Sequence, residues 1–319
     1  MSEESIQQTP GMPPTLNHIV GQRNAIEQAK VALDCAFQEG TAFPHVLMTG
    51  PPGLGKTLLA KVIAREMAVP LLEVLGQSLV GPMELNALLL TATDKSVVFI
   101  DEADGIWNEA VQVGLYRAVE ERVLHLGPSE PGKRPQKLPL ADFTLILASN
   151  NEFSIVAPLR DRMKLTLRFE FYTLEQLIEV LKQRTRALGW QVEPEVIPLI
   201  AARGRGTPRI ALRVLEACRR VCRSSGEIVI RCSDFKRACD LEGLDSRGLD
   251  RQEVQLLRML DDARGPLRLN VIATRLGLPA RTITSVFESY LIREGLIERV
   301  PEGRLITSLG HEHLHSSES

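Results

Sequence analysis

Short apolar runs alternate with amphipathic helical patterns over the first half of the chain. The runs are HVLMTG, LLEVL, SVVFID, FTLILAS and KLTLRF. Such alternation is typical of a mainly parallel, doubly wound sheet with helices on both faces. We therefore expect an α/β domain over residues 15–172, preceded by a disordered tail over residues 1–14, which are rich in Ser, Gln, Gly and Pro.

The pattern changes after residue 172. Over residues 173–245 the strands nearly stop, and four helical segments follow, begun at Thr, Pro or Ser and ended by glycines. Residues 246–319 contain two helical segments, a short turn LPA, a longer helix over 281–295 and two strand-like pieces joined by PEG, which predicts a winged helix. We expect the terminal HEHLHSSES to be a solvated, mobile tail rather than a metal site.

Composition narrows the protein class without deciding the function. The 319 residues are 44% hydrophobic and 24% charged, as in ordinary globular chains of two or three domains. The chain has no run of 18 apolar residues, and its start is acidic and polar, so we expect a soluble, cytoplasmic protein. Five cysteines without a CxxC pair suggest neither a disulfide framework nor a zinc site. The net charge of −2 neither supports nor excludes a nucleic-acid partner.

The stretch GPPGLGKT, residues 50–57, predicts a phosphate-binding loop. It matches GxxxxGK[ST] in full, follows the strand HVLMT and opens a helix. Glycines let backbone N–H groups approach phosphates closely, and the helix N-terminus adds partial positive charge. Lys56 would reach the β and γ phosphates of ATP, and Thr57 would bind Mg²⁺. The predicted contacts with ATP in this loop are Gly53, Leu54, Gly55, Lys56, Thr57 and Leu58.

Polar residues at two further strand ends complete a hydrolytic site. In SVVFIDEAD, residues 96–104, the apolar strand ends in two adjacent carboxylates: Asp101 is expected to hold Mg²⁺, and Glu102 is expected to polarise the attacking water. FTLILASN ends at Asn150, whose amide would hold the same water. An asparagine at a strand end is by itself only a turn residue, so this role depends on the two preceding motifs.

These motifs resemble the AAA+ ATPase class and, within it, the RuvB family of Holliday-junction branch-migration motors. The stretches that carry the resemblance run in the family's order from near the start of the chain to near its end: TLNHIVGQ, HVLMTGPPGLGKT, LYRAVEER, FTLILASN, APLRDRM, FEFYTLEQL, RGTPRIALRVL and SYLIREGLIERVPEGR. The resemblance implies an AAA+ P-loop domain, a helical small ATPase domain and a winged-helix head. It also implies a homo-oligomeric ring, usually a hexamer, that acts on duplex DNA at four-way junctions.

Several site residues follow from this resemblance alone. Arg162 of APLRDRM matches an arginine finger that acts on the neighbouring subunit's ATP, and Arg209 of GTPR matches an arginine that senses the γ-phosphate from the small domain. Tyr172 would lie against the adenine. Glu120, Glu121 and Arg122 fall where the family touches nucleotide across the subunit boundary. Arg160, by contrast, is interpreted as holding its own turn.

The resemblance implies a DNA-contacting head. Residues 264–304 contain seven Arg and four Glu without Lys or Asp, and 7 − 4 gives +3. A local positive face suits contact with phosphates. Arg299 and Arg304 flank the wing and are the predicted DNA-binding residues. A winged helix that contacts proteins remains the alternative.

Four departures from the family pattern bear on partners. Glu302 makes the wing PEGR where the family has a PRGR-like run, Met12 stands where an arginine precedes the adenine pocket, and Asn151 replaces an arginine after Asn150. The segment 125–142, where the family grips its partner RuvA, is rich in Pro, Gly and charge, and Leu138 and Leu140 are the remaining apolar candidates for docking.

Three functions therefore remain open. The first is a motor that drives branch migration. The second is a related ATPase that remodels a different DNA or protein assembly. The third is a winged-helix DNA-binding module switched by ATP binding without turnover, against which Glu102 and Arg162 argue, since a binding switch requires neither a water-polarising acid nor a finger.

Overall fold

The computed structural model describes residues 13–126 and 136–316 of the chain. Residues 1–12, which include Met12 and most of the predicted tail, lie outside the described residues, as do 127–135 of the segment 125–142 and the last three residues. The chain forms two compact units, residues 1–180 and residues 181–319, and their division falls within helix α6. The domain boundaries at 172 and 245 stay predictions.

A five-stranded parallel sheet forms the centre of the first unit, with the strand order β2-β3-β6-β1-β7. The sequence predicted all of these strands. Their bounds are β1 (Val46–Thr49), β2 (Leu71–Leu75), β3 (Val97–Asp101), β6 (Thr144–Ser149) and β7 (Leu165–Arg168). The middle strands β1, β3 and β6 are buried along most of their length, because helices cover both faces. The predicted α/β class is thus confirmed.

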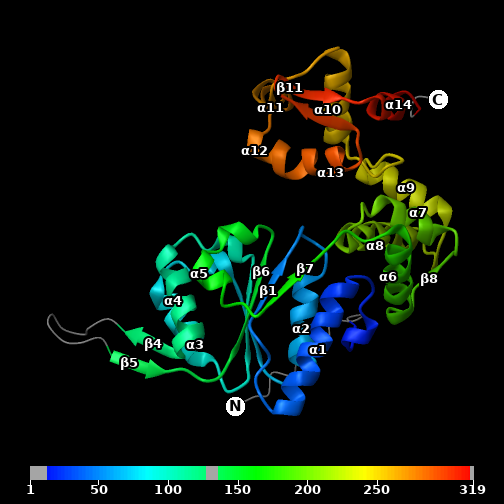
Figure 1. The fold of residues 1–319 in the computed structure, drawn as a ribbon. Helices are drawn as coiled ribbons and strands as arrows, with labels where there is room; N and C mark the ends of the chain where they lie inside the picture. The colour runs from blue at the N-terminus through cyan, green and yellow to red at the C-terminus, as the bar shows by residue number, and fades with distance from the viewer. Residues whose placement is uncertain (1–12, 127–135, 317–319) are drawn as a thin grey trace. The chain divides into compact units, whose positions relative to one another are not determined.

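Helices α3 and α4 lie on one side of this sheet, and α1 and α2 lie on the other (Figure 1). Leucines and valines of α3 and α4 pack against β3 and β6 in one continuous apolar core, to which Leu85, Leu115, Val98 and Leu147 belong. The helices of this unit are α1 (Arg23–Glu39), α2 (Lys56–Glu66), α3 (Pro82–Thr91), α4 (Glu109–Glu121), α5 (Ala157–Arg160) and the start of α6 (Leu174–Ala187), with 3-10 turns at Leu16–His18, Gly76–Ser78, Ala103–Gly105 and Glu152–Ser154.

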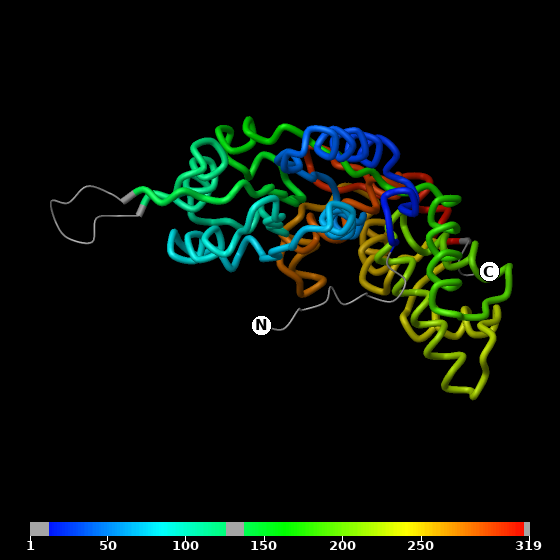
Figure 2. The backbone as a smooth tube through the Cα atoms, turned by 90° about the horizontal axis from the view of Figure 1, so that it is seen from below, coloured from blue at the N-terminus to red at the C-terminus, as the bar shows by residue number. Residues whose placement is uncertain are grey.

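An antiparallel ribbon, β4 (Val123–Leu126) paired with β5 (Gln136–Pro139), projects from the first unit (Figures 1 and 2). It occupies the segment expected to grip a partner. Leu138 and Leu140, the two apolar residues that the sequence offered for docking a partner, are half-buried and pack against the core of the unit. Their apolar surface is thus partly used within the chain itself.

The second unit begins with a helical part and ends with a winged helix. The helical part contains α7 (Val196–Arg203), α8 (Pro208–Ser224) and α9 (Cys232–Glu242), with a minimal parallel pair, β8 (Gln191–Val192) and β9 (Val229–Ile230). The winged helix contains α10 (Arg251–Asp262), α11 (Leu269–Leu276), α12 (Ala280–Thr282), α13 (Glu288–Arg293), β10 (Ile297–Val300), β11 (Gly303–Ile306) and α14 (Ser308–Ser316). These parts confirm the predicted helical and winged-helix architecture.

Two details of the winged helix differ from the sequence expectation. The helix predicted over 281–295 is interrupted by a π-helical turn, Ile283–Phe287, where the hydroxyls of Thr284 and Ser285 donate to carbonyls one turn earlier. The expectation of a mobile tail is wrong for residues 311–316, because they form α14. Leu314 is buried in the apolar core of the winged helix and fixes this helix in place.

No helix within the described parts of the chain combines the length and the apolar character needed to cross a membrane.

Candidate nucleotide-binding site

The loop between β1 and α2 has the backbone shape of a phosphate-binding loop. Gly50, Gly53 and Gly55 all have positive φ angles. A Cβ atom at Gly50 would lie 2.5 Å from the carbonyl oxygen of Phe169, so only glycine fits where the loop passes the chain after β7. Leu54 is buried and anchors the loop, and Gly55 is the N-cap of α2, which begins at Lys56. Loop and helix N-terminus are therefore arranged for backbone N–H groups to receive phosphate oxygens.

Lys56 is buried, and its ammonium group is directed into this loop. Nζ donates to the carbonyl oxygens of Gly50 at 2.6 Å and Pro51 at 2.9 Å, and to Oδ1 of Asn150 at 3.0 Å. Buried ammonium groups need such partners, because the charged form loses its hydration. Phosphate oxygens would be stronger acceptors than these carbonyls, so a bound phosphate could replace them as the partners of Lys56.

Thr57 and Asp101 come together although 44 residues separate them. The Thr57 hydroxyl donates to Oδ2 of Asp101 at 2.6 Å, while Oδ1 accepts the backbone N–H of Glu102 at 2.9 Å. A hydroxyl beside a carboxylate at the carboxyl edge of the sheet is an oxygen set that suits Mg²⁺. Glu102 itself is exposed and has the left-handed backbone conformation, with φ of 50°, which is uncommon for a residue other than glycine.

Asn150 is positioned by an acid that the sequence reasoning missed. Oδ1 of Asp104 accepts the backbone N–H of Asn150 at 3.1 Å and the hydroxyl of Ser149 at 3.0 Å. The signal was present in the sequence, because Asp104 is the last acid of the DEAD stretch. The structure thus brings Lys56, Asn150 and the pair Thr57 and Asp101 to one edge of the sheet.

Tyr172 lies between the phosphate-binding loop and the segment before α1. Its hydroxyl donates to the carbonyl oxygen of Leu54 at 3.2 Å, and its ring packs so closely on Gly21 that a Cβ there would lie 2.8 Å from ring carbon Cε1. Burial raises the pKa of Tyr172. A pocket of about 310 Å³ is lined by Gln22, Arg23, Asn24 and Ala25 around the start of α1 and by Arg168, Glu170, Phe171, Thr173 and Gln176 after β7. Residues next to Tyr172 and Gly21 in the chain thus line a cavity, and the contact of Tyr172 with adenine stays a prediction.

Gln22 is a second residue that the sequence reasoning missed. Its amide exchanges two hydrogen bonds with the backbone of Glu170, at 2.7 and 3.0 Å. This contact ties the segment before α1 to the segment after β7. Gln22 and Glu170 are 148 residues apart in sequence, so the sequence does not indicate that they are in contact. The only local signal was the glutamine at the end of TLNHIVGQ.

Arg162 lies on the surface beside α4. Its Nη2 donates to Oε1 of Glu120 at 2.5 Å, and its guanidinium lies 5.5 Å from the centre of the Tyr116 ring. The hydrogen bond to Glu120 raises the pKa of Arg162. Arg160, by contrast, lies over the Phe153 ring at 5.3 Å, within its own part of the chain. The two arginines of APLRDRM thus have different surroundings.

Glu121 and Arg122 lie beyond Glu120 along the chain. Glu121 pairs with His125 at 2.9 Å, which holds the pKa of this carboxyl below its usual range. Arg122 donates to the carbonyl oxygen of Phe143 at 2.7 Å and pairs with Asp142 at 2.9 Å. Both partners precede β6, at the amino edge of the sheet, whereas the phosphate loop lies at the carboxyl edge. Arg122 therefore lies at the opposite edge of the sheet from the phosphate loop of the same chain.

Arg209 lies in the second unit, exposed on the first turn of α8. Four residues earlier, Arg205 joins the helical part to the winged helix. Its Nη1 donates to Oε1 of Glu253 at 2.8 Å, its Nε donates to the carbonyl oxygen of Gly248 at 2.8 Å, and its guanidinium lies 4.3 Å from the centre of the Tyr290 ring. Burial raises the pKa of Glu253, and the pairing with Arg205 opposes this effect.

The predicted DNA-binding arginines share one buried acid. Arg299 donates through Nε to Oε2 of Glu288 at 2.9 Å, and Arg304 donates through Nε to Oε1 at 2.7 Å. Glu288 is 0% exposed. The Arg299 side chain is 53% exposed to solvent, whereas the Arg304 side chain is 17% exposed. Part of the positive charge of the wing is thus neutralised within the protein. Arg281, which starts the interrupted helix, is an exposed cation that was not among the predicted DNA-binding residues.

Three family models cover the chain in order. They are described as the Holliday junction DNA helicase RuvB P-loop domain, matching residues 12–169, the RuvB AAA lid domain, matching 172–245, and the RuvB C-terminal winged helix domain, matching 246–315.

Individual relatives agree with these models. The Holliday junction branch migration complex subunit RuvB of Kosmotoga olearia is 36% identical over 95% of this chain and 89% of its own. The Wolbachia protein of the same name is 36% identical over 95% of this chain and 93% of its own. A solved structure of Thermotoga maritima RuvB, described as a Holliday junction branch migration motor, superposes with a TM-score of 0.82 at 32% identity and covers 96% of this chain and 98% of that one.

Proposed function

The chain belongs to the RuvB family of AAA+ ATPases, as its motifs predict, and we propose on this basis that it drives branch migration of Holliday junctions in homologous recombination and DNA repair. Duplex DNA at four-way junctions is the proposed substrate, and the cytoplasm is the proposed compartment. The observation that carries the proposal is that a complete phosphate-loop site, with Thr57 against Asp101, lies in a chain that matches RuvB along 95% of its length.

The geometry of the loop fits ATP as a substrate. Lys56 would exchange the carbonyls of Gly50 and Pro51 for phosphate oxygens, because charged acceptors bind an ammonium group more strongly. Thr57 and Asp101 would hold Mg²⁺, which neutralises phosphate charge. Glu102 would accept a proton from the attacking water, and Asn150 would orient that water. Asp104 supports this by fixing the backbone of Asn150.

A ring, which we propose to be a hexamer, completes each site from the neighbouring subunit. Arg162, which contacts Glu120, would neutralise developing charge on the phosphoryl group bound in the neighbouring subunit. Glu120, Glu121 and Arg122 would contact the same nucleotide across the subunit boundary. The placement of Arg122 at the amino edge of its own sheet favours a role across a subunit boundary over one in its own site. Arg209 would sense the γ-phosphate from the second unit.

We expect Glu102→Gln to retain ATP binding and to lower ATP turnover by at least about 10²-fold, because general base catalysis typically contributes 10²–10⁴. ATP hydrolysis is measured with and without four-way junction DNA, and ATP binding with a fluorescent analogue. Glu109→Gln, an exposed acid at the start of α4, is the matched control and should hydrolyse ATP at the parent rate. Unchanged turnover in Glu102→Gln would remove the assigned base.

The action of Arg162 across the boundary is tested by mixing subunits. Arg162→Ala subunits can bind ATP, and Lys56→Ala subunits cannot, so each alone should be inactive. Mixed rings contain interfaces with an intact loop on one side and an intact finger on the other. We expect partial recovery of hydrolysis in mixtures, and an absence of recovery at every ratio would contradict a finger that acts in trans.

A second candidate function is a RuvB-related ATPase that remodels a different DNA or protein assembly. Two observations favour it: Glu288 already engages both wing arginines, and Leu138 and Leu140 pack on the core of their own unit. The comparison is an ATPase and branch-migration assay on the same junction with and without RuvA. Stimulation by junction DNA with RuvA supports the motor, and stimulation only by another DNA or protein supports this candidate. ATP binding without hydrolysis under all of these conditions would instead support the nucleotide-gated DNA-binding module.

A further inference from the structure

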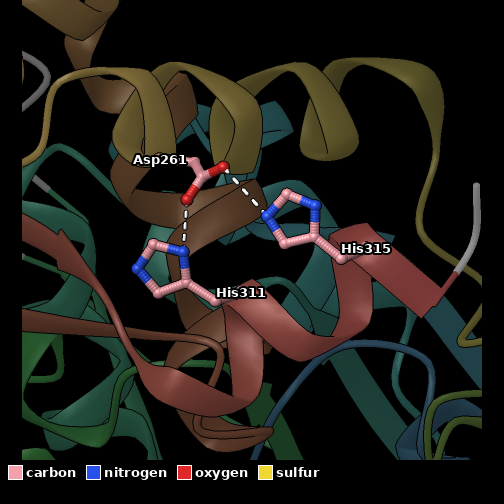
Figure 3. A group of neighbouring side chains, drawn as sticks. All are labelled: Asp261, His311 and His315. Atoms are coloured by element: carbon pink, nitrogen blue, oxygen red, sulfur yellow. Dashed lines mark ion pairs between the residues drawn. The ribbon is translucent and has the colours of Figure 1, made fainter.

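Two histidines of α14 and an aspartate of α10 face one another on the winged helix. His311 and His315 lie four residues apart, so their side chains leave the same face of α14 (Figure 3). Both imidazoles point at the carboxylate of Asp261, the penultimate residue of α10. Nδ1 of His311 contacts Oδ1 of Asp261, and Nε2 of His315 lies 3.6 Å from Oδ2.

The three groups have the separation of a metal-ligand set. One ligand atom from each residue lies within 4.8 Å of the others. In a tetrahedral zinc site with bonds of about 2.0–2.1 Å, neighbouring ligand atoms lie roughly 3.3 Å apart, so small side-chain rotations would bring these atoms to that distance. Two histidines at this spacing on one helical face are a recurrent zinc-binding arrangement, and a carboxylate is a common third ligand.

The chemistry of the set selects the type of metal. Imidazole nitrogen suits Zn²⁺, Ni²⁺ and Cu²⁺, whereas Mg²⁺ and Ca²⁺ prefer oxygen ligands. The position also suits binding from solvent, because His311 and His315 are exposed. His313, two residues from each, is buried and pairs with Oδ2 of Asp245 at 2.7 Å, so it holds α14 in place independently of the cluster. The ligand set is thus carried by a docked helix.

We propose that His311, His315 and Asp261 bind one Zn²⁺ ion per chain, with water in the remaining position, and that this ion links α14 to α10. The ion would join the first and last helices of the winged helix. A bound ion stabilises the folded form in proportion to its occupancy, so zinc should raise the thermal stability of this part of the chain. The alternative is that Asp261 simply forms ion pairs with the two histidines and binds no metal.

The two cases are distinguished by titrating the full-length chain with ZnCl₂ in excess Mg²⁺. Calorimetry measures the affinity and number of zinc ions bound, and thermal unfolding measures the stabilisation by zinc. We expect one zinc site in the parent chain and at least a tenfold weaker affinity in His311→Gln and in His315→Gln. His315 is 67% exposed, so its replacement should not disturb folding, which circular dichroism checks. His18→Gln, an exposed histidine of the first unit, is the control and should bind zinc as the parent does.

Two further measurements separate this site from other ligands in the chain. Asp101→Asn should keep the site, which excludes zinc at the phosphate loop. Co²⁺ bound in place of zinc should give visible absorption without the near-ultraviolet thiolate band that a cysteine site would produce. The proposal is overturned if the parent chain binds no zinc, if His315→Gln binds it equally well, or if the cobalt spectrum reports thiolate ligation.

Discussion

His45 has a strongly perturbed ionisation at the amino end of β1. Burial, reinforced by the nearby charges of Arg122 and Lys164, lowers the pKa of His45 from 6.5 to about 3. Its Nδ1 accepts the backbone N–H of Leu145 at 2.8 Å, which the neutral ring can do and the charged ring cannot. The folded chain therefore holds this histidine neutral at pH values where the unfolded chain binds a proton.

This lowered pKa predicts how the stability of the first unit depends on pH. Because the unfolded chain binds more protons between pH 6.5 and about 3, the free energy of unfolding should fall with falling pH in that window, by up to about 1.4 kcal/mol per pH unit. Well above this window the ionisation of His45 should add no pH dependence to the free energy of unfolding. His45→Asn keeps an acceptor for Leu145 and should flatten this slope, as measured by urea unfolding at several pH values, while the control His18→Gln keeps it. Equal slopes in all three chains would contradict the assignment.

At the residue scale, contiguity in sequence decides what could be predicted. Lys56 and Thr57 lie in one motif with a strand before it and a helix after it, so their type and spacing sufficed. Glu288 could not be recognised as the partner of two wing arginines, because it lies in a different element and its burial depends on how the helix packs. The role of Asp104 likewise depends on a contact 46 residues away.

At the scale of elements, the wing and its preceding helix form one electrostatic unit. Glu288 at the start of α13 binds Arg299 of β10 and Arg304 of β11, which pair with each other across the ribbon. Two guanidinium groups share one carboxylate, so one net positive charge remains. Such sharing restricts how far either side chain can reach toward a phosphate.

We expect Glu288→Gln to free this charge for DNA. Duplex affinity at low salt should rise, and the plot of log affinity against log salt should become steeper by about one unit, because each added phosphate contact contributes roughly 0.9. Glu298→Gln, an exposed acid of β10, changes the net charge equally without touching the arginines and is the control. Fluorescence anisotropy over a salt series measures both. An equal change in the two variants would mean that net charge alone acts.

The elements of the winged helix also show where sequence patterns lose information. The alternation of β10 and β11 and the turn PEG identified the ribbon, because turn residues are local signals. The polar tail HEHLHSSES gave no comparable signal for α14, since the packing of its few apolar residues onto α10 is a tertiary effect. The histidines could be interpreted as ligands only after α14 placed two of them one turn apart.

At the scale of the whole molecule, Arg205 links the helical part of the second unit to the winged helix. Glu253 is 1% exposed, and Arg205 is its partner, so the pair is removed from solvent. Tyr290 adds to the junction through its ring, which lies under the Arg205 guanidinium, and Arg293 donates to the carbonyl oxygen of Arg205 at 2.8 Å. The two parts of this unit are therefore joined by polar contacts, of which those of Arg205 are partly buried.

Arg205→Ala should destabilise the second unit by about 3–5 kcal/mol, because it leaves a buried carboxylate without its cation. Arg220→Ala removes an exposed ion pair with Glu242 and should cost less than about 1 kcal/mol. Urea unfolding of the full chain gives both values. We also expect Arg205→Ala to lose DNA stimulation of ATP hydrolysis while still binding ATP. Similar losses of stability in the two variants would contradict the role of the buried pair.

The stretch RGTPR carries both this junction and the proposed γ-phosphate sensor. Arg205 is fixed by Glu253, and Arg209 leaves the first turn of α8 four residues later. Because α8 begins at Pro208, a single residue inserted between them would change where the helix starts relative to Arg205 and would displace Arg209. Length variation should therefore be excluded from this segment during evolution. Homologous chains that retain the acid of Glu253 should also retain the four-residue interval, even where the surrounding residues have diverged.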